Sequence, residues 1–307
     1  MSALPVFVAA GEALTDMLRS GADSWTSRVG GSTWNVARVM ARLGVASAFA
    51  GAVSRDVFGE ELAAANDRAG LDARFLQRLD KSPLLAIVHQ LNPPQYFFVG
   101  DDSADLHFDA SLLPPGWQQQ AKWVHFGGIS LARQPLGAKL LALAAELKAA
   151  GAAISYDPNF RVLMNRSYDA TLRAMVALAD VVKVSDEDLR GLFRSEDIEA
   201  SFATLRRWNP HASYLYTRGE QGAALYRGDG AWRAAPPKIE VVDSVGAGDA
   251  SMGGLLFSLM SRPQHGGAEH LRFAVAAGAG ACLAAGAAPP DLALVERLFE
   301  ASAASPL

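Results

Sequence analysis

The strongest constraint on the fold is a regular alternation of short apolar runs with longer amphipathic ones. The sequence predicts strands at 6–9, 48–53, 122–126, 153–156 and 181–184, and helices at 34–43, 58–69, 136–149, 170–178 and 186–193. This alternation predicts an α/β protein of three layers, in which helices cover both faces of a mostly parallel sheet. Ligands of such sheets bind beyond the carboxyl ends of the strands.

Two regions, 13–29 and 84–108, break the alternation and are predicted to hold strands without helices between them. Asn92-Pro93-Pro94 marks a turn inside the second region. We expect these strands to form a small separate sheet attached to a single α/β domain that spans 1–307.

Composition narrows the class of protein. Half of the 307 residues are apolar, the net charge is only −4, and there is no dense block of Lys and Arg. This balance argues against nucleic acid or an anionic membrane as the main partner. The single cysteine, Cys282, is expected to be a buried structural thiol in a reducing compartment, and 6–10 is too short for a signal sequence, so we expect a cytoplasmic protein. The long uncharged stretch 273–288 is rich in Ala and Gly and predicts a close-packed core helix.

Near the end of the chain, a predicted strand at 239–242 is followed by Asp243-Ser244-Val245-Gly246-Ala247-Gly248-Asp249 and a predicted helix at 251–260. Small residues at Gly246, Ala247 and Gly248 allow a ligand to approach the backbone, whose N–H groups would bind an anion. Asp249 could then accept a proton from an attacking hydroxyl. Asp is also favoured near helix starts for its charge alone, so the motif by itself leaves a structural role open.

The chain lacks both the G-x-x-x-x-G-K-[ST] and the G-x-G-x-x-G nucleotide-binding loops. A dinucleotide-dependent oxidoreductase is therefore disfavoured. If phosphates bind, the turn from Gly246 to Gly248 has to hold them.

Five ordered segments resemble the ribokinase/PfkB-type carbohydrate kinases, with the fructokinase branch the most similar. The matching segments are Gly30-Gly31-Ser32-Thr33-Trp34-Asn35, Asp157-Pro158-Asn159-Phe160-Arg161, Lys183-Val184-Ser185-Asp186-Glu187-Asp188, Thr217-Arg218-Gly219-Glu220-Gln221-Gly222 and Asp243 to Asp249. The resemblance implies a ribokinase-like fold and an ATP-dependent kinase that uses Mg²⁺, with K⁺ as a further candidate cation. It also implies that the small sheet is a lid over the sugar and pairs two subunits into a homodimer.

On this resemblance, the sugar-binding residues are Asp16, Gly30, Gly31, Asn35 and Arg161, with Asp249 as the base. Glycines permit close approach of the backbone, and Asn offers both a donor and an acceptor to neighbouring hydroxyls. Other roles remain open: Arg161 could be an ordinary surface residue, and Ser32 or Thr33 could cap a helix that begins there.

The resemblance places a second group of residues at the nucleotide. These residues are Lys183, Ser185, Thr217, Gly219, Gly222, Gly246 and Gly248. Asp188 is expected to contact Mg²⁺ through water, and Asp243 to help bind a monovalent cation. Ser185 would also cap a helix at 186–193, and a hairpin turn would explain Gly219 and Gly222 equally well.

Fructose is the first choice of substrate. The second is 2-keto-3-deoxygluconate, because Arg161 could bind its carboxylate, and the third is ribose or a nucleoside. The chain departs from the family at Trp34, at Val99-Gly100 and at Asp188, where many members carry Glu. Trp34 and Val99-Gly100 fall where the sugar is expected. The changes at Val99-Gly100 and at Asp188 keep open a non-enzyme alternative, a degenerate kinase that binds a sugar for regulation, although the intact Asp249 and Gly-Ala-Gly turn speak against it.

Overall fold

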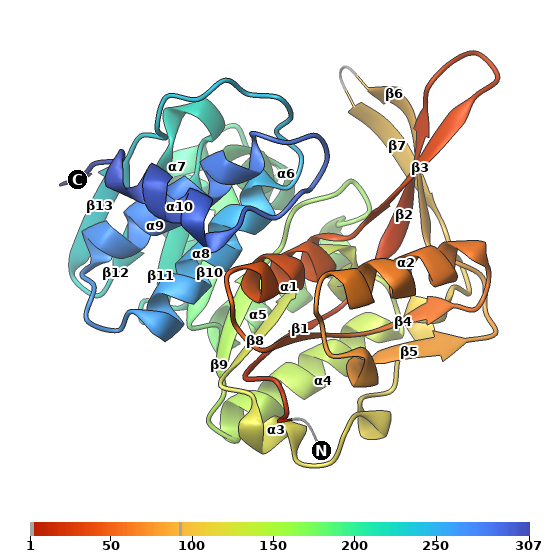
Figure 1. Ribbon diagram of the computed structural model, residues 1–307. Helices are drawn as coiled ribbons and strands as arrows, with labels where there is room; N and C mark the ends of the chain where they lie inside the picture. Colours follow the sequence, from red (N-terminus) through yellow and green to blue (C-terminus); the bar gives the residue numbers. More distant parts are fainter. Residues whose placement is uncertain (1–2, 92–93) are drawn as a thin grey trace.

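The alternation of strands and helices builds one large sheet with helices on both faces, and a smaller sheet projects from one end (Figure 1). The computed structural model describes residues 3–91 and 94–307. Within this part of the chain, none of the helices combines the length and the apolarity needed to cross a membrane.

The large sheet has ten strands in the order β14-β13-β12-β11-β10-β9-β8-β1-β4-β5. They are β1 (Phe7–Ala10), β4 (Ser47–Ser54), β5 (Leu76–Leu79), β8 (Trp123–Gly127), β9 (Ala153–Asp157), β10 (Val181–Ser185), β11 (Ser213–Thr217), β12 (Ala223–Arg227), β13 (Gly230–Ala234) and β14 (Ala304–Pro306). Neighbouring strands from β5 to β11 are parallel, and those from β11 to β14 are antiparallel. The predicted mostly parallel sheet is confirmed.

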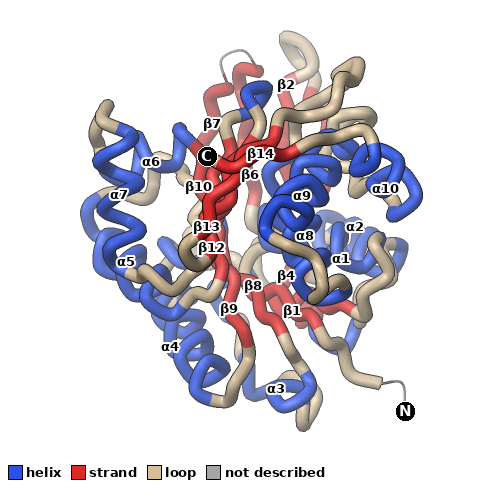
Figure 2. The backbone as a smooth tube through the Cα atoms, turned by 90° about the vertical axis from the view of Figure 1, so that its left-hand side faces the viewer, coloured by secondary structure: helices blue, strands red, loops and turns tan. Residues whose placement is uncertain are grey.

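Helices form a layer on each face of this sheet, as Figure 2 shows, with α4 to α7 on one side and α1, α2 and α8 to α10 on the other. Their bounds are α1 (Ser32–Arg42), α2 (Val57–Arg68), α3 (Trp117–Gln120), α4 (Leu136–Ala149), α5 (Asp169–Leu178), α6 (Asp186–Phe193), α7 (Ile198–Trp208), α8 (Ala247–Ser261), α9 (Gly267–Ala281) and α10 (Leu292–Glu300). Short 3₁₀ helices are η1 (Ala73–Phe75), η2 (Ala104–His107), η3 (Ala110–Leu112), η4 (Gly128–Ala132), η5 (Arg166–Tyr168) and η6 (Gly219–Gln221).

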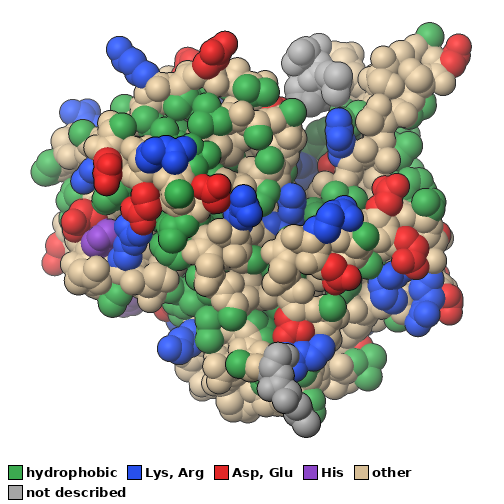
Figure 3. All heavy atoms as spheres, in the orientation of Figure 1, with side chains coloured by type: hydrophobic (Ala, Val, Ile, Leu, Met, Phe, Trp, Pro, Cys, Tyr) green, Lys and Arg blue, Asp and Glu red, His purple; other side chains and the backbone are tan. Residues whose placement is uncertain are grey.

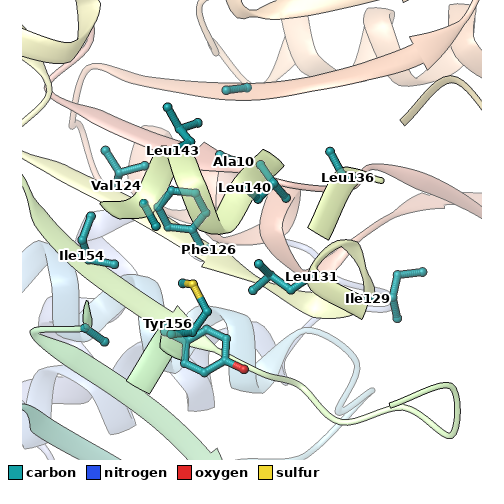
Figure 4. Close-up of a cluster of buried hydrophobic side chains, with 14 of the residues drawn as sticks. Ala10, Val124, Phe126, Ile129, Leu131, Leu136, Leu140, Leu143, Ile154 and Tyr156 are labelled. Atoms are coloured by element: carbon teal, nitrogen blue, oxygen red, sulfur yellow. The ribbon is translucent and has the colours of Figure 1, made fainter. Parts of the chain in front are cut away.

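The core explains why the strands read as unbroken apolar runs. On one face, Val124, Phe126 and Ile154 of β8 and β9 pack against Leu140 and Leu143 of α4 (Figure 4). A second buried cluster lies on the opposite face, between the sheet and α1, α8 and α9. Because strands of a parallel sheet are covered on both faces, neither face of a strand needs polar residues.

The smaller sheet has the order β3 (Trp25–Gly30), β2 (Leu14–Arg19), β6 (Leu85–Leu91) and β7 (Pro94–Val99). This confirms a separate sheet built from the two irregular regions. The prediction of strands up to 108 is wrong, because the last strand ends at Val99, Gly100 adopts a φ of 157°, and the chain turns into η2. Asn92 and Pro93 of the predicted turn lie outside the described residues.

Three predicted elements of the C-terminal third differ from the structure. Residues 239–242 form no strand, since β13 is already paired on both sides by β12 and β14. Helix α8 begins at Ala247, four residues earlier than predicted. Helix α9 ends at Ala281, so the stretch to 288 is a loop and Cys282 is only partly buried.

Candidate active site

The predicted site residues gather where strands β9, β10 and β11 end. Asp157 is the last residue of β9, Ser185 of β10 and Thr217 of β11, and these strands are neighbours in the sheet. The carboxyl ends of parallel strands share one edge, so this edge is formed as predicted. Asp243 belongs to a loop instead, because the expected strand before it is absent from the structure.

Helix α8 begins at this edge with the glycine turn. Gly246 is the residue before the helix and has a φ of 83°, a left-handed conformation that suits glycine. A Cβ atom there would lie 2.8 Å from Ala287, so the turn also packs too closely for a side chain. The first turn of a helix leaves backbone N–H groups without partners inside the helix, and the helix dipole adds positive potential. The turn is therefore suited to bind an anion.

Asp249 lies in the first turn of α8 and is 8% exposed. Its Oδ1 atom accepts a hydrogen bond from Ser32 Oγ at 2.7 Å, and its Oδ2 atom accepts one from Asn35 Nδ2 at 2.8 Å. Burial raises the pKa of Asp249, while Ser32, Asn35, Lys183 and Arg161 oppose the rise. A carboxylate with a raised pKa is a stronger base near neutral pH.

The start of α1 differs from the sequence prediction. Neither Ser32 nor Thr33 is the capping residue, which is Gly31, with a φ of 116°. Ser32 instead donates to Asp249, and Thr33 Oγ1 lies 3.3 Å from the Gly127 carbonyl oxygen. The sequence pattern marked the helix start but not the direction in which these hydroxyls point.

A buried charge cluster lies directly beneath the glycine turn. Lys183 Nζ is 3.0 Å from Asp157 Oδ2 and 3.8 Å from Asp188 Oδ2. A Cβ atom placed on Gly248 would lie 3.3 Å from the same ammonium group. Burial lowers the pKa of Lys183, but Asp157 and Asp188 outweigh it and hold this pKa above its ordinary value. A charged ammonium is therefore fixed next to the predicted anion site.

Asp188 is held by the start of α6. Its Oδ2 atom accepts hydrogen bonds from the backbone N–H and the hydroxyl of Ser185, and its Oδ1 atom accepts one from the Phe160 N–H. The Asp188 N–H in turn donates to Ser185 Oγ, so the predicted cap is confirmed and is a reciprocal capping box. These donors and the nearby ammonium make Asp188 a poor direct ligand for Mg²⁺. Across residues 3–91 and 94–307, no group of three or more His, Cys, Asp or Glu is placed to hold a metal ion.

The predicted sugar residues of the smaller sheet lie together. Asp16 of β2 is next to Gly30 of β3, where a Cβ atom would approach Asp16 Oδ2 to 2.5 Å. Burial raises the pKa of Asp16 to about 6, although the positive charge of Arg161 opposes the rise. Arg161 Nη1 bonds to the side chain of Asn159 at 2.7 Å and to the Phe160 carbonyl at 2.7 Å. Arg161 is thus fixed in its own loop with its charge near Asp16.

Gly219 and Gly222 lie in the turn between the antiparallel strands β11 and β12, so the predicted hairpin is confirmed. Their φ angles are 52° and 86°, and a Cβ on Gly222 would lie 2.0 Å from the Ala234 carbonyl oxygen. These glycines are needed by the hairpin itself. Thr217 is half-buried at the end of β11.

The carboxylate of Asp243 connects two loops. Its Oδ1 atom accepts a bond from the Val245 N–H and its Oδ2 atom one from the Gly286 N–H. The loop at 282–288 is thereby held against the glycine turn.

Sequence reasoning missed Glu12, a buried carboxyl two residues after the end of β1. Its Oε2 atom lies 2.5 Å from Ser130 Oγ and 3.3 Å from Thr33 Oγ1. Burial raises the pKa of Glu12 to about 7. Gly128, with a φ of 61°, leaves the space that this side chain fills. An acid directly after a strand was the only sequence signal, and solvated loop acids show the same pattern.

Trp34 is also placed differently than expected. It is 1% exposed, and its Nε1 atom donates to Asn66 of α2. Trp34 therefore contributes to the packing between α1 and α2. On the surface, the region below the smaller sheet is hollowed, and Lys and Arg side chains gather along the hollow (Figure 3).

Comparison with known proteins identifies one family over nearly the full chain. The family described as "pfkB family carbohydrate kinase" matches residues 7–293. The chain belongs to the pfkB family of carbohydrate kinases.

This kinase is 33% identical to a fructokinase of Klebsiella pneumoniae over 294 residues, which is 93% of this chain and 89% of that protein. The solved structure of a fructokinase from Xylella fastidiosa with bound ATP matches with a TM-score of 0.86 and 29% identity, covering 97% of this chain and 99% of the other. An aminoimidazole riboside kinase from Salmonella enterica, solved with its riboside and an ATP analogue, matches with a TM-score of 0.84 and 29% identity over 95% and 99% of the two chains. The ribokinase-like fold and the assignment as an ATP-dependent, fructokinase-like sugar kinase are confirmed.

Proposed function

We propose that this kinase phosphorylates the primary hydroxyl of fructose, with Asp249 as the base and the turn from Gly246 to Gly248 as the anion site. One observation carries the proposal. A buried carboxylate with a raised pKa occupies the same helical turn as the glycines, and a buried ammonium lies just beneath that turn. The carboxylate that accepts the proton and the groups that stabilise charge on the phosphoryl oxygens therefore lie side by side, as phosphoryl transfer requires.

In the proposed reaction, the substrate hydroxyl gives its proton to the Asp249 carboxylate as its oxygen bonds to the γ-phosphorus of ATP. The bond from that phosphorus to the oxygen bridging to the β-phosphorus breaks, and ADP leaves with the electron pair. Backbone N–H groups of the glycine turn and the ammonium of Lys183 face the charge that builds on the phosphoryl oxygens. Ser32 and Asn35 each occupy only one lone pair of an Asp249 oxygen, so the carboxylate can still accept a proton.

The remaining predicted residues are assigned within this proposal. Asp16, Gly30, Gly31, Asn35 and Arg161 bind the sugar, and Lys183, Ser185, Thr217, Gly219 and Gly222 bind the nucleotide. The smaller sheet is a lid belonging to the same folding unit as the large sheet, and its closure excludes water. Asp188 would face, through water, a Mg²⁺ ion bound to the ATP phosphates, and such an ion would neutralise part of the phosphate charge.

A potassium ion is proposed at Asp243, whose oxygens each keep a lone pair beyond the bonds to Val245 and Gly286. Turnover in KCl above that in tetramethylammonium chloride at equal ionic strength would support it, and equal rates would exclude it. We also propose that the protein acts in the cytoplasm, which cell fractionation would test.

The deciding experiment measures ADP release with Mg²⁺-ATP and fructose, 2-keto-3-deoxygluconate, ribose or aminoimidazole riboside. We expect the highest kcat/KM with fructose, and a loss of kcat in Asp249→Asn of ~100-fold or more. Asp197→Asn is the control, because Asp197 likewise lies at a helix start, where it caps α7, but is exposed. Undiminished turnover in Asp249→Asn would exclude the proposed base, and preference for the riboside or the keto acid would replace fructose as the substrate.

The face of the smaller sheet opposite Asp16 carries exposed apolar side chains, which supports the proposed homodimer. Trp25, Phe97 and Val99 are 42%, 53% and 46% exposed. The strand register puts Phe97 opposite Ile87, and Asp16 in line with Ala86 and Phe98, so the apolar residues and Asp16 lie on opposite faces. A second copy of the chain is the proposed occupant, since two such faces are complementary to each other.

Analytical ultracentrifugation would test the dimer. We expect a dimer for the natural chain and a monomer for Phe97→Asp. Val162→Asp is the control, because Val162 is 84% exposed and lies outside the smaller sheet. A monomeric natural chain, or a dimer that survives Phe97→Asp, would contradict this interface.

A further inference from the structure

A positively charged side chain that the proposed reaction does not use lies next to the base. Arg38 of α1 is half-buried, and its Nη1 atom donates to Asn35 Oδ1 at 3.2 Å and to the Ala287 carbonyl at 3.0 Å. Its guanidinium lies over the ring of Trp34, 4.4 Å from the ring centre. Two directional bonds and one stacking contact therefore fix this group in a single place.

The first of these bonds decides which way the Asn35 amide points. A guanidinium only donates hydrogen bonds, so it selects the oxygen of the Asn35 side chain. The amide nitrogen is then directed to Asp249, to whose Oδ2 atom it donates at 2.8 Å. If the amide were reversed, its oxygen would face the Asp249 carboxylate and its NH₂ group would face a guanidinium, and both contacts would be repulsive.

The second bond ties the same side chain to the anion site. The Ala287 carbonyl belongs to the loop that packs against Gly246, where a Cβ atom would be 2.8 Å from Ala287. Asp243 also holds this loop, by accepting a hydrogen bond from the Gly286 N–H. Arg38 thus links the residue that orients the base to the loop that supports the glycine turn.

We propose that Arg38 is a positioning residue for phosphoryl transfer, which orients Asn35 toward Asp249 and holds the 282–288 loop against the glycine turn. The inference rests on the proposed role of Asp249. Two consequences follow. Loss of the guanidinium would let the Asn35 amide rotate and the loop move, and a displacement of about 1 Å at a reacting group costs ~100-fold in rate.

The second consequence is electrostatic. The charged groups that face Asp249 are Arg38 from α1, Lys183 from β10, and Arg161 and Asp157 from β9 and the loop after it. Burial lowers the pKa of Arg38, and its attraction to Asp249 opposes that fall. By reciprocity, removing the positive charge raises the pKa of Asp249 and moves the acid limb of the kcat profile to higher pH.

The test compares Arg38→Met and Arg38→Lys with the natural chain in kcat, KM and the pH profile of kcat. We expect Arg38→Met to lose ~10- to 100-fold in kcat and to shift the acid limb upward. Arg38→Lys is expected to keep the acid limb near its natural position while kcat stays low, because an ammonium supplies charge but not two fixed bonds. Arg42→Met, an exposed arginine of the same helix with a surface ion pair to Asp291, should behave as the natural chain.

A double-mutant cycle separates positioning from general damage. If Arg38 acts through Asn35, Arg38→Met costs much less in a chain that already carries Asn35→Ala. Natural kcat and an unmoved acid limb in a folded Arg38→Met protein would overturn the inference, as would equal losses with and without Asn35. Should Arg38→Met fail to fold, Arg38→Lys decides the question alone, because a kcat of Arg38→Lys equal to that of the natural chain would refute the need for two bonds. Failure of the proposed base itself would appear separately, as full activity in Asp249→Asn.

Discussion

Glu12 offers a quantitative test of how this interior treats a carboxyl group. Burial raises its pKa from an ordinary 4.5 to about 7. Below pH 4.5 the group is protonated in both the folded and the unfolded chain, and the folded state has its full stability. Between 4.5 and about 7 the unfolded chain releases the proton while the folded chain keeps it, so the free energy of unfolding falls. At about 1.4 kcal/mol for each pKa unit, the loss approaches ~3 kcal/mol above pH 7.

Replacing Glu12 by Gln removes the titration but keeps an acceptor for Ser130 and Thr33. We expect the difference in unfolding free energy, Glu12→Gln minus natural, to rise by ~3 kcal/mol between pH 4.5 and 8. The difference cancels contributions from the other buried carboxyl groups. Urea unfolding followed by circular dichroism at pH 4.5, 6 and 8 measures it, provided that the slope with urea is the same for both proteins.

Glu61→Gln is the matched control, because Glu61 is exposed on α2. Its difference from the natural chain should stay constant over the same range. A constant difference for Glu12→Gln would show that the pKa of Glu12 is the same in the folded and the unfolded chain. A falling difference would show that Ser130 and Thr33 stabilise the ion more than burial destabilises it. Either result would refute the reasoning.

Three further predictions follow from the same geometry. Lys183→Met leaves Asp157 and Asp188 buried without their cation and should cost about 3–5 kcal/mol in urea unfolding. Lys183→Arg should restore part of this stability, and no loss in Lys183→Met would show that the ion pairs do not stabilise the fold. Gly31→Ala should destabilise the chain by about 1–3 kcal/mol, because the φ of Gly31 is 116° and the new Cβ would lie 2.7 Å from the Glu12 carbonyl oxygen. Gly266→Ala is the control and should be tolerated, because the φ of Gly266 is −77°. If Asp16 binds the sugar as proposed, the KM for the sugar should rise as pH falls through about 6, where Asp16 takes up a proton and accepts hydrogen bonds from sugar hydroxyls less well, and this dependence should vanish in Asp16→Asn.

Several features of the fold were predictable because they depend on local chemistry. Strands β1, β4, β8, β9 and β10 were found within one or two residues of their predicted bounds, since parallel strands buried on both faces read as unbroken apolar runs. Helix α6 was predicted with its cap, because Ser followed by three acids fits a helix start. Errors arose where pairing partners decide: 239–242 has strand-forming residues, but β13, the strand before it in the chain, is already paired on both sides by β12 and β14.

The sequence by itself determined the family, the layered sheet and the chemistry-bearing residues of the glycine turn, because ordered motifs and period-two or helical patterns are written locally. Only the tertiary structure decided which groups surround Asp249. Ser32 and Asn35 are more than two hundred positions away from it in the chain, and Arg38 reaches Ala287 across a similar separation. The raised pKa of Glu12 arises in the same way, from burial by distant segments. Burial and hydrogen bonding between distant segments depend on how helices and strands pack, and no local pattern of residues encodes that packing.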